Sequence, residues 1–112
     1  MEEKLPITDF TKLNLQVGQI SSVSDHPNAD KLYILNVDLG EETERQIIAG
    51  LKNHYTKEEL ENKKAIFITN LQPAVLRGEE SQGMILAAVS KDKKEVAFIT
   101  PEKDIPIGTK IS

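Results

Sequence analysis

The sequence predicts an all-β domain with a small helical content. Apolar runs of strand length recur along the chain, at 13–20, 31–38, 45–49, 63–69, 84–90 and 95–100. Alternation is clearest in the second run, where Tyr33, Leu35 and Val37 share one face. Between the third and fourth runs, Thr56-Lys57-Glu58-Glu59 has the pattern of a capping box and predicts one helix of about two turns.

Length and composition indicate one globular domain spanning residues 1–112, with residues 1–8 as a loose leader. The chain has 38% hydrophobic and 29% charged residues, which argues against disorder. No apolar run approaches the roughly 20 residues of a membrane helix, so we expect no membrane partner. The absence of cysteine excludes disulfides and thiolate chemistry and fits a cytoplasmic protein.

The first strand should be bent, and a short helical turn should precede it. Thr8 and Asp9 are suitable caps for a turn that continues to Lys12. From Leu13 to Val17 the apolar residues alternate, but Ile20 falls on the other register after Gly18. A glycine at such a change of phase indicates a β-bulge or a sharp bend.

The order of elements is three strands, a short helix, and then at least two strands. That order is the order of the OB-fold, a five-stranded barrel whose strands and loops bind oligonucleotides. We expect a C-terminal extension in which 107–111 adds a short last strand. A small antiparallel sandwich fits the number of strands nearly as well.

The charge distribution bears on the class of ligand. A net charge of −4 argues against broad binding of phosphate backbones. The charge is uneven, however, because acidic residues cluster at 41–44 and 58–61, whereas Lys63, Lys64 and Arg77 lie in or beside the polar stretch 70–83 and the apolar run before it. A local basic face on an acidic chain favours selective contact with single-stranded or looped RNA.

Four stretches resemble one family: DFTKLNLQVGQI, HPNADKLYILNVDLG, RQIIAGL and NLQPAVLRGEESQGMILAA. They are similar to the tRNA-binding OB-fold domain of methionyl-tRNA synthetases, of other synthetases and their cofactors, and of free-standing dimeric tRNA-binding proteins. The resemblance covers residues 9–111. It implies a tRNA-binding module that acts in trans with an aminoacyl-tRNA synthetase, with the methionyl enzyme favoured, or as its β subunit.

The resemblance also implies partners and a site. Free-standing members of the family are homodimers, and some are export-related chaperones that bind unfolded polypeptide, which is the alternative function. The RNA-contacting positions of the family fall on Lys31, Asn70, Arg77, Ser81 and Met84.

Each of these side chains has a structural interpretation beside the functional one. Asn70 could read a base edge or hold the end of a strand. Arg77 could contact a phosphate or stack on a base, and this is favoured over simple solvation. Ser81 could bond a ribose 2′-hydroxyl or be a turn residue. Met84 could offer an adaptable surface or begin the core of the next strand.

Catalysis and cofactors find no support in the sequence. It lacks the glycine-rich, GxSxG and HExxH motifs, so we expect a binding protein that is not an enzyme and holds no cofactor. His26 and Asp30 are too few to hold a metal and are better explained as turn structure. His54 and Tyr55 are expected to pack against the barrel.

Overall fold

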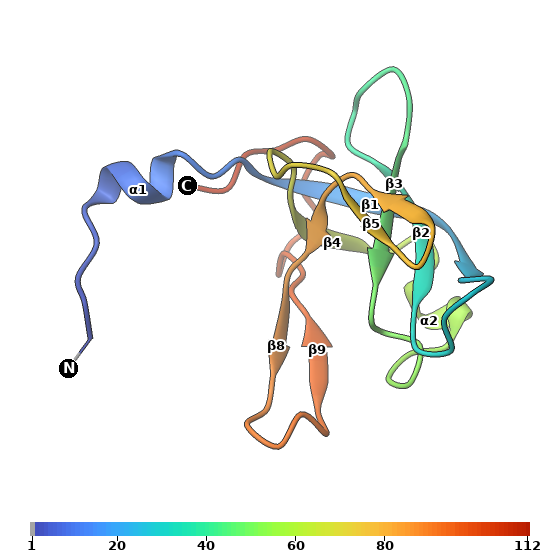
Figure 1. Ribbon diagram of the computed structural model, residues 1–112. Coiled ribbons are helices and arrows are strands. Elements are labelled where there is room, and N and C mark those ends of the chain that lie inside the picture. Colours follow the sequence, from blue (N-terminus) through green and yellow to red (C-terminus); the bar gives the residue numbers. More distant parts are fainter. Residues whose placement is uncertain (1) are drawn as a thin grey trace.

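The computed structural model describes residues 2–112, and in them two helices and nine strands (Figure 1). In chain order they are α1 (Ile7–Thr11), β1 (Leu15–Asp25), β2 (Tyr33–Asp38), β3 (Arg45–Ala49), α2 (Lys57–Leu60), β4 (Lys64–Ile68), β5 (Ala74–Leu76), β6 (Glu79–Ser81), β7 (Met84–Ile85), β8 (Ala87–Val89) and β9 (Val96–Phe98). None of the helices among these residues is long and apolar enough to cross a membrane.

Five strands form one antiparallel sheet in the order β3-β2-β1-β4-β7. The sheet curls into a nearly closed barrel around side chains that are fully buried, among them Ile20, Leu35, Ile47, Leu60 and Phe67. Leu60 comes from α2, the helix between the third and fourth strands. The predicted OB-type barrel is therefore confirmed, and the sandwich alternative is wrong.

Both faces of the first half of β1 are buried. Leu15 and Val17 point outward and pack with Ile66 and Ile68 of β4 in a second apolar cluster, whereas Ile20 points into the barrel. The change of phase at Gly18 thus marks a switch from one buried face to the other. The prediction of a bulge at that glycine is wrong.

The bulge lies three residues later, where the register between β1 and β2 shifts between Ile20 and Ser22. Gly18 has a packing role instead. A Cβ atom placed on it would lie 2.8 Å from side-chain atoms of Leu39 and Phe67, and 2.9 Å from Val37. The absence of a side chain at this position lets the two walls of the barrel meet.

The C-terminal segment covers the outer cluster, where Ile105 and Ile111 pack against it. A last strand at 107–111 was predicted, but the segment makes only an isolated bridge between Gln16 and Lys110. Backbone hydrogen bonds still run along β1, including Gly108 N to Val17 O at 2.7 Å and Ile111 N to Leu15 O at 2.8 Å.

The polar stretch 70–83 contains a β-hairpin, formed by residues 74–81. Strands β5 and β6 pair from Ala74–Ser81 to Leu76–Glu79. Arg77 and Gly78 both have positive φ, 53° and 89°, as a two-residue type I′ turn requires. Asn, Asp or Gly is usual at the first of these positions, so the Arg77–Gly78 pair did not indicate this turn in the sequence.

Two other predicted elements differ at their ends. Helix α1 has Pro6 at its N-cap and no side-chain cap, so the capping role predicted for Thr8 and Asp9 is wrong. The predicted strand 84–90 is divided at Leu86 into β7, which pairs with β4, and β8, which pairs with β9. The capping box of α2 is confirmed.

Replacing Gly18 with alanine should destabilise the protein by about 1–3 kcal/mol, because the added methyl group overpacks the core. The matched control is Gly50→Ala, where the added Cβ would meet only Leu32 at an ordinary 3.9 Å. Urea denaturation of both variants measures the difference. Equal stabilities of the two variants would show that the core adapts to the methyl group.

Candidate functional site

The tip of the β5–β6 hairpin is attached to the turn at 26–31. His26 is buried, and its Nδ1 accepts a hydrogen bond from the Asn28 backbone N–H at 3.0 Å, while Nε2 lies 2.8 Å from the Leu76 carbonyl oxygen. Because a backbone N–H can only donate, the ring carries its proton on Nε2 and donates it to Leu76. The Asn28 amide adds a bond to the Arg77 carbonyl oxygen at 3.4 Å.

This attachment places the turn that ends at Lys31 against the hairpin tip that carries Arg77, two of the predicted site residues. Lys31 ends the turn, and Arg77 occupies the tip of the hairpin; both are exposed. Neither cationic group forms an ion pair within residues 2–112. The two side chains thus offer positive charge to a ligand from neighbouring segments that are 46 positions apart in the sequence. His26 itself is structural, as expected.

Other lysines at this end are engaged by Asp25. Lys57 and Lys52 contact its carboxylate at 3.0 and 3.1 Å. These hydrogen bonds, from Lys57 first, lower the pKa of Asp25 below its ordinary 3.8 and raise the pKa of Lys57. The stabilisation is present above the ordinary carboxyl pKa and is lost as the pH falls through the lowered value.

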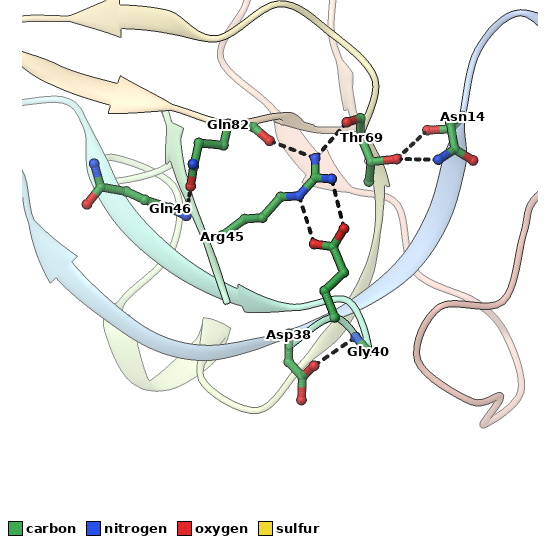
Figure 2. Close-up of polar contacts among 8 residues, drawn as sticks. Asn14, Asp38, Gly40, Arg45, Gln46, Thr69 and Gln82 are labelled. Atoms are coloured by element: carbon green, nitrogen blue, oxygen red, sulfur yellow. Dashed lines mark hydrogen bonds and ion pairs between the residues drawn. The ribbon is translucent and has the colours of Figure 1, made fainter. Parts of the chain in front are cut away.

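The base of the hairpin closes the barrel through Arg45, a residue that the sequence analysis did not select. Its Nη1 donates to the carbonyl oxygens of Thr69, at 2.6 Å, and Gln82, at 3.1 Å. Its Nε and Nη2 donate to the two carboxylate oxygens of Glu41 at 2.9 and 3.0 Å (Figure 2). The i, i+4 spacing of Glu41 and Arg45 could have suggested an ion pair between them. It could not show that Arg45 also binds the two ends of the segment 69–82, because that contact depends on the tertiary structure.

Ser81 belongs to the same closure. Its side chain is buried, and its hydroxyl accepts from the Ile48 backbone N–H at 2.9 Å and donates to the Gly83 carbonyl oxygen at 3.0 Å. Gly83 passes so close to β4 that a Cβ would lie 2.9 Å from the Ile68 carbonyl oxygen. Ser81 is therefore not free for a ribose in this arrangement, and its RNA contact stays a prediction.

Asn70 and Met84 flank the base of the hairpin. The Asn70 amide oxygen accepts from the Asn14 N–H at 2.8 Å, and its nitrogen donates to the Lys12 carbonyl oxygen at 2.7 Å. These bonds support the structural interpretation of Asn70. The Met84 side chain is 44% exposed and begins β7 next to Ile68.

The exposed surface of this region carries Lys31 and Arg77 at the tip, next in sequence to the acidic residues Asp30, Glu79 and Glu80, and apolar side chains along the sides. Leu71, Val75, Leu76 and Met84 are all at least 39% exposed. A guanidinium on the hairpin, an ammonium on the neighbouring turn and nearby apolar side chains can bind phosphate and the faces of bases. Among residues 2–112, no group of three His, Cys, Asp or Glu side chains could hold a metal ion.

Comparison with known proteins agrees with this chemistry. Residues 15–110 match the family model described as "Putative tRNA binding domain". The match covers most of the chain, so the protein belongs to this family of tRNA-binding domains. The predicted family is confirmed, and it is a family of binding modules.

The relatives connect the chain with methionine–tRNA ligases. It is 53% identical over 109 residues to the Methionine--tRNA ligase of Pyrococcus horikoshii, in an alignment that covers 97% of this chain and 15% of that protein. The chain thus spans a small part of the length of this relative.

Solved structures match the whole fold. A MetRS-related protein from Pyrococcus horikoshii superimposes with a TM-score of 0.91 at 36% identity, covering 99% of this chain and 100% of that one. The chaperone CsaA from Bacillus anthracis does so with a TM-score of 0.87 at 26% identity, covering 98% and 100%.

Replacing Ser81 with alanine should cost about 1–3 kcal/mol of stability, because the buried Ile48 N–H loses its acceptor. Ser24→Ala is the control, since Ser24 is exposed and its hydroxyl makes no hydrogen bond within residues 2–112. Urea denaturation compares the two. If both variants were as stable as the original chain, the hydroxyl would not be needed for closure.

Proposed function

We propose that the chain binds tRNA on the hairpin face, defined by the turn 26–31, the hairpin 74–81 and the flanking residues Asn70 and Met84. The observation that carries this is the pair of exposed cations, Lys31 and Arg77, held on neighbouring segments by His26 in a domain of the tRNA-binding family. Recognition rests on tRNA shape and a few positioned groups, because the net charge of −4 gives no general attraction to phosphate.

The five predicted residues divide into two roles in this proposal. Lys31 and Arg77 contact phosphates or stack on bases, and Met84 contacts a sugar or base. Asn70 and Ser81 hold the hairpin in place through the bonds described above. Substitution of the second group should weaken RNA binding through the shape of the hairpin.

The natural partner is an aminoacyl-tRNA synthetase. The similarity to methionine–tRNA ligases supports the methionyl enzyme, with this domain acting in trans or as a β subunit. A single small face binds weakly, so association with a catalytic chain would raise the apparent affinity of the enzyme for tRNA through effective concentration.

Replacing Arg77 with glutamine should weaken binding of a methionine tRNA transcript about tenfold and lower the salt dependence by about one phosphate contact. The fold should be unaffected, since the side chain is exposed and makes no hydrogen bond within residues 2–112. Fluorescence anisotropy at two salt concentrations measures both effects.

The charge-matched control is Lys103→Gln, at an exposed lysine of the loop after β9. Equal affinities of the two variants would mean that the hairpin tip does not contact the RNA.

We also propose that the chain forms a homodimer through α1 and the C-terminus. The C-terminus lies beside α1 (Figure 1), and a hollow of about 270 Å³ between them is lined by Ile7, Phe10, Leu13 and Ile111. Ile7 is 73% exposed, and α1 buries none of its residues. A second copy that covered this apolar surface would place two tRNA-binding faces in one particle.

The Phe10→Asp variant should be monomeric and remain folded, because Phe10 contributes to no buried core. Val75→Asp, at an apolar residue that is 69% exposed on the hairpin, is the control and should not change the mass. Analytical ultracentrifugation measures the mass of each. A dimer that survives Phe10→Asp would place the interface elsewhere.

Polypeptide binding is the second candidate function, favoured by the likeness to the chaperone CsaA and by the exposed apolar side chains Leu71, Val75 and Leu76. Competition separates the two candidates. Unfolded polypeptide that displaces the tRNA transcript at equal concentration would favour this second function.

A further inference from the structure

His54 has a side chain that the proposed function does not use. Tyr55 packs against the core of the barrel, as predicted, and against Phe98 with ring centroids 5.1 Å apart. His54 differs, because its ring is half-buried, is not part of the core cluster, and makes no hydrogen bond within residues 2–112. An imidazole with both nitrogens available at a surface is suited to contact a ligand.

The ring opens onto a hollow of about 380 Å³, which we name the His54 hollow. Its lining includes Gly50, His54, Met84, Val89 and Lys93. Met84 is the residue that flanks the base of the tRNA-binding hairpin, so the hollow continues that face toward β8 and β9. These two strands project away from the barrel (Figure 1).

The turn between β8 and β9 holds Lys93 in place. Ser90 N donates to Glu95 O at 2.9 Å, and the Lys93 N–H donates to Ser90 O at 2.9 Å. The Asp92 carboxylate accepts from the Ser90 hydroxyl and from Lys94 N at 2.6 and 3.0 Å. Asp92 therefore orders the turn, and the Lys93 ammonium group forms no ion pair within residues 2–112.

The composition of the hollow selects one kind of ligand. Apolar side chains at Met84 and Val89 suit the face of a planar base, and a neighbouring imidazole can stack on it or bond its edge. An ammonium group at the rim attracts a phosphate. A volume of about 380 Å³ lies within the range of small-molecule sites and is too small for a stacked duplex.

We propose that the His54 hollow binds one unpaired nucleotide of the RNA that lies on the hairpin face. The base contacts Met84, Val89 and His54, and its phosphate contacts Lys93. This inference rests on the proposed tRNA binding and adds to it a preference for RNA with an unpaired loop or end. A fully paired duplex can occupy the hairpin tip but leaves the hollow empty.

The chain supplies its own probes for this site. It contains two histidines and two methionines, so the ring protons of His26 and His54 and the methyl group of Met84 can be followed separately by NMR. His26 reports on the hairpin tip through its bond to Leu76, whereas His54 and Met84 report on the hollow. The ligands are a methionine tRNA transcript and a fully paired RNA duplex of the same length.

With the transcript, signals of all three residues should shift, and with the duplex only that of His26. Shifts of His26 alone with both RNAs would overturn the inference and leave the proposed function intact. No shift of any residue and no change in anisotropy would overturn both. Shifts of His54 and Met84 with an unfolded polypeptide but not with the transcript would assign the hollow to protein ligands and also overturn it.

Two lysines of one turn provide the matched variants. Lys93→Gln should weaken binding of the transcript about five- to tenfold, because a charge-assisted contact to phosphate is lost. Lys91→Gln removes the same charge from the same turn but from a residue that does not line the hollow, and should weaken binding less than twofold. Equal effects of the two substitutions would mean that the lysines of this turn act only through their general positive charge, and would overturn the inference.

Discussion

The free edge of β3 is the constraint on which the rest of the structure depends. An OB-type barrel has to satisfy the backbone groups of its terminal strand, and β3 has no strand partner beyond β2 among the described residues. The segment 80–83 meets this need with one backbone hydrogen bond, from Gln82 N to Gln46 O at 2.8 Å, and with side chains. Ser81 accepts from Ile48 N, Gln82 accepts from Gln46 N at 3.0 Å, and Gln46 donates to the Glu80 carbonyl oxygen at 2.8 Å.

This closure gives the polar stretch of the sequence a structural role beside its role in the proposed binding surface. Arg45 fixes where the hairpin returns, and His26 fixes its tip. Between these two attachments β5 is exposed along its length, whereas in β6 Glu79 is half-buried, Glu80 is exposed and Ser81 is buried. The two arginines of the chain have different roles. Arg45 is hydrogen-bonded within the fold, whereas Arg77 is exposed in a turn where its φ is positive. Rigidity at both ends lets a small surface present its groups without a large entropic cost.

Sequence patterns predicted the barrel well where local periodicity and burial agree. The alternation of Tyr33, Leu35 and Val37 and the capping box at Thr56 are both present in the structure. Prediction failed where tertiary contacts decide. Gly18 looked like a bulge because the chain segment that covers Leu15 and Val17 lies at the other end of the sequence. The division of 84–90 at Leu86 likewise follows from pairing with two different strands.

By itself, the sequence determined the class of fold and the family and singled out the residues of the proposed site, because strand period, turn chemistry and motif order are local properties. Only the tertiary structure decided what those residues do. It placed the Ser81 hydroxyl and the Asn70 amide on backbone groups, left Lys31 and Arg77 exposed, and set His54 beside Met84 and Lys93. The physical reason is that a polar side chain is available to a ligand only if no nearer backbone group claims its hydrogen bonds, and those neighbours come from distant parts of the chain.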